Sequence, residues 1–271
     1  MNGKNHRRLA CSLFVFILLF SAAQAAAQNW VDGQIAIIED KTGLILPQGG
    51  MCDNMLFANP PCMNHAAAAF YAEHPDNYDM LMFFTPQTVL MNMQMGFPVQ
   101  KAAEGIGLDG SIHPYNPAMF GSAGRLRQCV KMGTLSALPN NPGDLVSGLL
   151  QITGTELMAH EIGHQWLAWI MVDHNDGQGP LGVLRGFESD KPNGHWSCWF
   201  NNHGSVMYGG NIEDNGDGTY TDHGGDRRYS QLDQYLMGLR SPEEVDPMFY
   251  IKVDGTNEGC ASVPVGPGGT R

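Results

Sequence analysis

The sequence has little positive charge. Its 271 residues include 15 Lys and Arg against 27 Asp and Glu, a formal charge of −12 at pH 7. An acidic chain is repelled by phosphate backbones and by anionic lipid, so we expect neither nucleic acid nor a membrane among its partners. Internal repeats, blocks of like charge and low-complexity tracts are also absent. These absences favour an ordinary globular domain.

Long hydrophobic runs are equally scarce, since the only one lies near the N-terminus. Three basic residues precede the apolar run Leu9–Phe20, and small residues follow it. The run is shorter than the roughly 20 apolar residues that cross a bilayer, and Ala-x-Ala cleavage sites end at Ala25 and Ala27. We therefore expect residues 1–27 to be a signal peptide. The mature, exported protein would then carry 12 basic and 27 acidic side chains, a formal charge of −15.

Cysteines are few, and their number in the mature chain is odd. Five remain after the signal peptide: Cys52, Cys62, Cys129, Cys198 and Cys260. Disulfides persist in exported proteins, and we predict a local bridge between Cys52 and Cys62, with several pairings open to the others. The odd count and the loop-like ending at residues 266–271 are consistent with a partner cysteine in sequence beyond this chain.

The first half of the sequence contains several strand patterns. Residues 34–38 and 43–47 are short apolar segments between turn formers. The continuous apolar run 78–85 is typical of a strand that is buried on both faces. The alternation over residues 125–132 predicts a strand with one solvated face. Together these segments predict a sheet.

Two helices are predicted further along the chain. The longer runs over about residues 154–171, where apolar side chains recur three and four apart. Thr153 and Glu156 have the spacing of a capping box at its start. The second helix is predicted at residues 230–239, with a Gly and a Pro near its end. Residues 174–211 are rich in turn formers and predict loops.

The longer helix carries the motif His160-Glu161-Ile162-Gly163-His164. Residues four apart lie on one face of a helix, so His160 and His164 can present ring nitrogens to one ion at about 2.0–2.1 Å. Zinc suits these ligands. Glu161 would lie beside the metal, where its carboxylate can act as general base towards a zinc-activated water. The motif therefore predicts a catalytic zinc site.

The competing interpretation is that the histidines are packed side chains at this spacing by chance. The chain would then be a catalytically inactive, secreted binding or adhesion domain with a structural metal site. The capped amphipathic helix and the strands before it are the context that the catalytic motif requires, and they favour the enzyme.

In this motif and in the strand-strand-helix order from about residue 78 to 170, the sequence resembles the zincin zinc metallopeptidases. The resemblance implies an α+β fold in which a mixed sheet packs on the active-site helix. Residues 28–271 would form a single domain, with sheet and helix in residues 28–172 and a loop-rich C-terminal part in 173–271. It also implies a secreted endopeptidase that hydrolyses peptide bonds of extracellular proteins or peptides.

A catalytic zinc needs a third protein ligand, and three residues are candidates. The sequence after His164 lacks the Gly and the final His of the extended metzincin motif. His195 could complete a metzincin-like site after a long insertion, and it is our first choice. Asp233, on the predicted second helix, is the alternative and would make the site aspzincin-like. Glu188 is the third, although its surroundings do not favour a helix.

The sequence around His195 adds further candidates. Ser205-Val206-Met207-Tyr208 resembles the Met-turn that underlies the metal in metzincins, although Met207 is equally typical of an ordinary core residue. Trp196 is a candidate for a substrate subsite or for the core, as is Trp199.

Other polar residues suggest a calcium loop and a donor for the oxyanion. Residues 213–219 concentrate oxygen ligands around glycines, which suggests Ca2+, although two Asx-Gly pairs there are also typical hairpin turns. Four side chains are candidate oxyanion donors: Tyr208, His223, Tyr229 and Tyr235.

Overall fold

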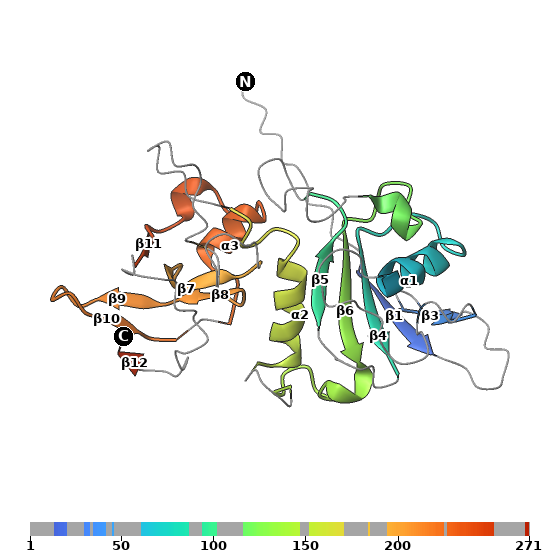
Figure 1. The fold of residues 1–271 in the computed structure, drawn as a ribbon, viewed down its shortest axis with the longest axis horizontal. Coiled ribbons are helices and arrows are strands. Elements are labelled where there is room, and N and C mark those ends of the chain that lie inside the picture. Colours follow the sequence, from blue (N-terminus) through green and yellow to red (C-terminus); the bar gives the residue numbers. More distant parts are fainter. Residues whose placement is uncertain are drawn as a thin grey trace, which may run out of the picture.

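The computed structural model of the chain has an α+β fold (Figure 1). It describes residues 14–20, 30–32, 35–41, 45, 61–86, 94–101, 116–146, 152–170, 184, 194–224, 227–251 and 269–270. None of the helices in this part of the chain is long and apolar enough to cross a membrane.

The main sheet has six strands in the order β2-β3-β1-β4-β6-β5. Their bounds are Trp30–Asp32 for β2, Ile35–Glu39 for β3, Phe14–Phe20 for β1, Met80–Thr85 for β4, Gln128–Thr134 for β6 and Met95–Pro98 for β5. The four inner strands run parallel, whereas β2 and β5 are antiparallel to their neighbours. The predicted mixed sheet is therefore present. The candidate strand at 43–47 lies outside the described residues except for Ile45.

Strand β1 is formed by the apolar segment that we expect to leave with the signal peptide. It lies between β3 and β4 and is parallel to both. A run that contains Val, Ile and three Phe residues has high strand propensity, so it can fill this place in a sheet. Cleavage within residues 21–27 would remove β1 from the fold.

One helix packs on each face of the main sheet. Helix α1, Pro61–Tyr71, contributes Met63, Ala67 and Phe70 to a core cluster with alternate residues of β3 and β4. Helix α2, Gly154–Gly163, covers the other face through Leu157. Apolar side chains of the sheet thus meet a helix on both sides. The sequence patterns did not predict α1, because the turn formers before it, including Pro60 and Pro61, indicated a loop.

The expectation of a solvated face on residues 125–132 is wrong for the part that forms the strand, β6. All seven residues of β6 are buried. Cys129, a free thiol, packs on the α1 side of the strand, while Val130 and Met132 pack on the α2 side. The buried Gln128 amide donates to the carbonyl of Glu161 at 2.9 Å. Arg125 and Arg127, the exposed members of the alternating pattern, precede the strand, whereas Lys131 within it is buried.

Helix α2 begins as predicted but ends earlier. Thr153 and Glu156 form the expected capping box. After Gly163 the amides of Gln165 and Trp166 bond three residues back instead of four, and the helix ends. The carbonyl of His164 accepts the indole N–H of Trp169 at 2.8 Å, so a side chain takes the place of the next backbone amide.

The C-terminal part contains two small sheets and a short helix, which lie on the far side of α2 from the main sheet in Figure 1. Its elements are β7 Trp196–Asn201, β8 Tyr208–Gly210, β9 Ile212–Asp214, β10 Tyr220–Asp222, α3 Gln231–Leu236, β11 Phe249–Tyr250 and β12 Gly269–Thr270. Three 3-10 turns complete the description: η1 Pro117–Phe120, η2 Leu135–Ala137 and η4 Pro242–Glu244. The second predicted helix is confirmed as α3. Strands β7 and β8 correct the expectation of loops throughout 174–211.

The predicted bridge between Cys52 and Cys62 falls outside the side chains that the structure describes.

Candidate metal centre

Helix α2 presents two histidines from its last turn. His160 lies within the helix, and His164 is the residue that caps its C-terminus. Their ring centroids are 5.0 Å apart, with the ring planes nearly perpendicular. The i, i+4 spacing of the motif therefore places both rings on the same side of the helix, as predicted.

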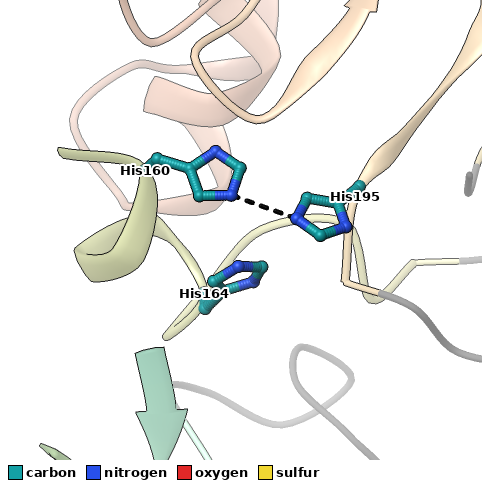
Figure 2. A group of neighbouring side chains, drawn as sticks. All are labelled: His160, His164 and His195. Carbon is teal, nitrogen blue, oxygen red and sulfur yellow. Dashed lines mark hydrogen bonds between the residues drawn. The ribbon is translucent and has the colours of Figure 1, made fainter. Parts of the chain in front are cut away.

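His195 joins this pair from the residue that precedes β7. Each of the three histidines offers a ring nitrogen, and these atoms all lie within 4.8 Å of one another. Figure 2 shows the three rings turned towards a common point, with Nε2 of His160 3.0 Å from Nε2 of His195. His195 comes from the C-terminal part of the chain, so the site forms only where that part packs against α2.

The arrangement fits a metal ion. Two nitrogens bound to a tetrahedral zinc at about 2.05 Å lie about 3.3 Å apart, so the His160–His195 pair at 3.0 Å needs to open by a few tenths of an ångström. The other nitrogens, within 4.8 Å, would have to close by at most about 1.5 Å. Nδ1 of His160 lies 2.7 Å from the carbonyl of Val206, so that nitrogen donates its proton there and Nε2 keeps its lone pair. Burial lowers the pKa of both His160 and His164, so both are neutral and able to bind a metal.

The segment after β7 lies beneath the metal site. Met207 is fully buried and packs against α2 at Gly163, where a Cβ would come within 2.6 Å of the Met207 sulfur. The Trp196 amide donates to the carbonyl of Met207 at 3.0 Å. Met207, in the segment that resembles a Met-turn, therefore packs against the helix that carries His160 and His164. The carbonyl of Val206, in the same turn, is the group that orients His160.

Glu161 lies beside the three histidines. Its Oε2 is 3.9 Å from Nε2 of His164 and accepts the backbone N–H of Gly96, on strand β5, at 2.7 Å. Burial raises the pKa of this carboxyl to about 8, and the bond from Gly96 opposes the shift. A Cβ at position 96 would lie 1.8 Å from the carbonyl oxygen of Glu161, so only glycine allows this approach.

No family model, curated protein or solved structure matches this chain. The assignment of the site therefore rests on its own residues and geometry.

The other two candidate ligands do not join the histidines. Asp233 is fully buried, but its carboxylate bonds Trp196, Ser205 and the backbone of Ser230. Among the described residues, the three histidines are the only such group of potential metal ligands. Glu188 lies outside the described residues.

The suggested calcium loop forms the turn of a hairpin between β9 and β10. Asp214 accepts the amide of Gly216 at 2.9 Å, and Asp217 accepts both the amide and the hydroxyl of Thr219. These carboxylates close the turn, as Asx residues commonly do, so the geometry gives no support to Ca2+.

Of the four candidate oxyanion donors, Tyr208 is the one at the metal site. Its ring lies 4.8 Å from that of His195 and 5.2 Å from that of His160. The Tyr229 hydroxyl instead donates to the carbonyl of Ala159. His223 pairs with Glu213 on the hairpin, and Tyr235 is exposed on α3.

Tyr208 has a left-handed backbone, with φ of 71°, which is costly for a non-glycine residue and is typical of functional sites. Two contributors to the site escaped sequence reasoning, the amide of Gly96 and the carbonyl of Val206. Both are backbone groups, which leave no signal in side-chain patterns.

Proposed function

We propose that this chain is a secreted, zinc-dependent endopeptidase. The observation that carries the proposal is the convergence of three histidines, from two parts of the chain, next to a buried glutamate. A set of three imidazoles that leaves one side open is typical of catalytic metal sites. His160 is 6% exposed and His164 is 9% exposed, whereas His195 is half-buried. The site is therefore most open to solvent at His195.

Zinc is the metal that these residues would hold. Three neutral nitrogens without thiolate or additional carboxylate match its tetrahedral preference. When bound, zinc supplies Lewis acidity and lowers the pKa of a coordinated water to about 7. The net positive charge of such a site would also favour the ionised form of Glu161, against the effect of its burial.

Glu161 and Tyr208 would then have separate tasks. The Glu161 carboxylate is held by the Gly96 amide at one oxygen, and it takes the proton of the attacking water and passes it to the leaving amine. The Tyr208 hydroxyl donates to the scissile carbonyl oxygen as that oxygen gains negative charge. Both are beside the histidines but are not needed to hold the metal.

A polypeptide substrate is supported by the position of β5 at the edge of the main sheet as described. The N–H of Gly96 points away from β6, towards Glu161. Because backbone groups alternate along an antiparallel strand, the backbone of Pro98 also faces away from β6. The Gly96 N–H is already bonded to Glu161, and Gly96 is only partly buried, so the substrate would approach this end of β5. An extended peptide would then lie along the edge strand, beside the histidines.

The proposal is tested by zinc content together with the variant Glu161→Gln. We expect about one zinc per chain in the purified protein and a large loss of zinc in His164→Ala. Glu161→Gln should keep the fold and the zinc but lose most casein hydrolysis, since the amide cannot accept the proton. His223→Ala, which removes an exposed histidine outside the site, is the matched control and should keep both zinc and activity.

Negligible zinc in wild type and His164→Ala alike would reject the metal centre. Zinc in the wild type without hydrolysis of casein or gelatin would favour the binding or adhesion domain instead.

A further inference from the structure

Asp233 is a buried carboxylate with more hydrogen bonds than its place on a helix requires. It is the third residue of α3 and has no exposed surface. As part of the capping box it accepts the amide of Ser230 at 2.7 Å. It also accepts two hydrogen bonds from outside the helix, one from Nε1 of Trp196 at 2.8 Å and one from the Ser205 hydroxyl at 2.5 Å. A capping box needs only one of the three.

The two additional bonds lead to two different metal-binding histidines. Trp196 is the first residue of β7 and directly follows His195 in the chain, so fixing its indole also restrains His195. Ser205 directly precedes Val206, whose carbonyl holds Nδ1 of His160 at 2.7 Å. The Asp233 carboxylate therefore connects the segment that carries His195 with the segment that orients His160.

The two partners of the Ser205 hydroxyl fix it as a donor to Asp233. Its oxygen accepts the amide of Met207 at 2.9 Å, so its proton is free to point at Asp233. A carboxylate, which only accepts, matches the three donors around it. An amide would instead have to point an N–H2 group at one of these donors.

We propose that Asp233 is a positioning residue for the metal centre. It holds His195 and the Val206 carbonyl in the geometry that lets both histidines reach one ion, and it thereby sets the affinity and coordination geometry of the site. This inference rests on the proposed metal centre. It does not require that the chain be a peptidase.

The test compares Asp233→Asn with Ser230→Ala. Ser230→Ala removes the other half of the same capping box, the bond from the Asp233 amide to the serine hydroxyl, and leaves the Trp196 and Ser205 bonds in place. Both variants weaken the start of α3, but only Asp233→Asn disturbs the connection to the histidines. Zinc affinity is measured by competition with a chelator, and the coordination geometry by the visible absorption spectrum of the cobalt-substituted protein.

We expect Asp233→Asn to bind zinc about 10–100-fold more weakly, as is typical when a partner of a metal ligand is lost, and to shift the cobalt spectrum. Ser230→Ala should keep the wild-type affinity and spectrum. If Asp233→Asn does not fold, Ser205→Ala removes the Ser205 bond to Asp233, together with the bond that the serine accepts from the Met207 amide, and should weaken zinc binding in the same direction. Equal effects of Asp233→Asn and Ser230→Ala, or no effect of Asp233→Asn and Ser205→Ala, would overturn the inference. A wild-type protein that binds no zinc would overturn the metal centre as well, so the two failures are distinguishable.

Discussion

Glu161 and Asp233 are both buried acids close to the end of a helix. Glu161 lies near the C-terminus of α2 and Asp233 near the N-terminus of α3, and their surroundings suit them to different roles. Burial raises the pKa of both carboxyls. Glu161 has a single backbone donor, from Gly96, and its carboxylate lies at the edge of the histidine group. Asp233 is surrounded by donors that oppose the shift and occupy its oxygens. A carboxylate with a raised pKa and a single hydrogen-bond donor suits proton transfer, whereas one whose oxygens are all occupied by donors suits positioning.

Tyr208 provides a prediction at this scale. Tyr208→Phe removes the hydroxyl and keeps the ring that packs beside His195 and His160. We expect kcat to fall on the order of 100-fold, because one donor to the developing oxyanion is lost, with zinc content and KM little changed. Steady-state kinetics on a fluorogenic peptide measures both constants.

The matched control is Tyr235→Phe, since Tyr235 is similarly exposed but lies on α3 away from the histidines. Similar kcat values for the two variants would show that Tyr208 does not contribute to catalysis.

At the scale of elements, α2 is capped at its N-terminus and carries two of the candidate metal ligands at its C-terminus. Thr153 caps its N-terminus, accepting the amide of Glu156 at 3.2 Å, while the Glu156 carboxylate accepts the amide of Thr153 at 2.7 Å. The histidines occupy the last turn. Gly163 lies between them and admits Met207, which packs the C-terminal part beneath the site.

Thr153→Ala should therefore lower stability without changing the metal site. Loss of the N-cap bond costs about 1 kcal/mol of unfolding free energy. In a chain of this size that corresponds to a fall in Tm of about 2–4 °C, measurable by calorimetry. Zinc content should stay at the wild-type level, because the cap is about two helical turns from His160.

Thr155→Ala is the control for this prediction. Thr155 is exposed in the same first turn, and its hydroxyl bonds only the carbonyl of Pro142. A smaller fall in Tm is expected there. An equal fall in both variants would show that the capping bond contributes nothing beyond an ordinary surface contact.

The elements that could be predicted from the sequence are those whose cause is local. The capping box of α2, the apolar run of β4 and the i, i+4 histidines each follow from residues close together in the chain. Asp233 could not be excluded as a ligand in this way, because its partners Trp196 and Ser205 become neighbours only on folding. The solvated face expected for β6 failed for the same reason, since α1 and α2 cover both of its sides.

On the scale of the whole molecule, the structure has three apolar clusters, two of which adjoin α2. One joins α1 to the main sheet, one joins α2 to the sheet, and the third holds the C-terminal part together around Trp196, Met207 and Leu232. The histidine group lies where the second and third clusters adjoin, because His160 and His164 belong to α2 and His195 precedes β7. Metal bound there would link the two parts of the molecule, in addition to the Tyr229 hydroxyl bond to Ala159.

The sequence predicts that the segment Phe14–Phe20 is removed with the signal peptide, whereas the structure places it as β1 between β3 and β4. Strands in a sheet lie about 4.8 Å apart, so loss of β1 would leave β3 and β4 roughly 10 Å apart unless they close and pair directly. Alternate side chains of both strands already pack on α1, which can hold them in place while the gap closes.

We predict that the exported protein begins near Gln28 and that β3 and β4 then pair with each other. N-terminal sequencing of the protein recovered from the medium or periplasm of an expressing host tests the cleavage, and hydrogen exchange of the β3 amides tests the pairing. A chain produced without residues 1–27 is the matched control, and it should have the same Tm and zinc content as the processed protein. An exported protein that retains residues 14–20, or a shortened chain that does not fold, would show instead that β1 belongs to the mature sheet.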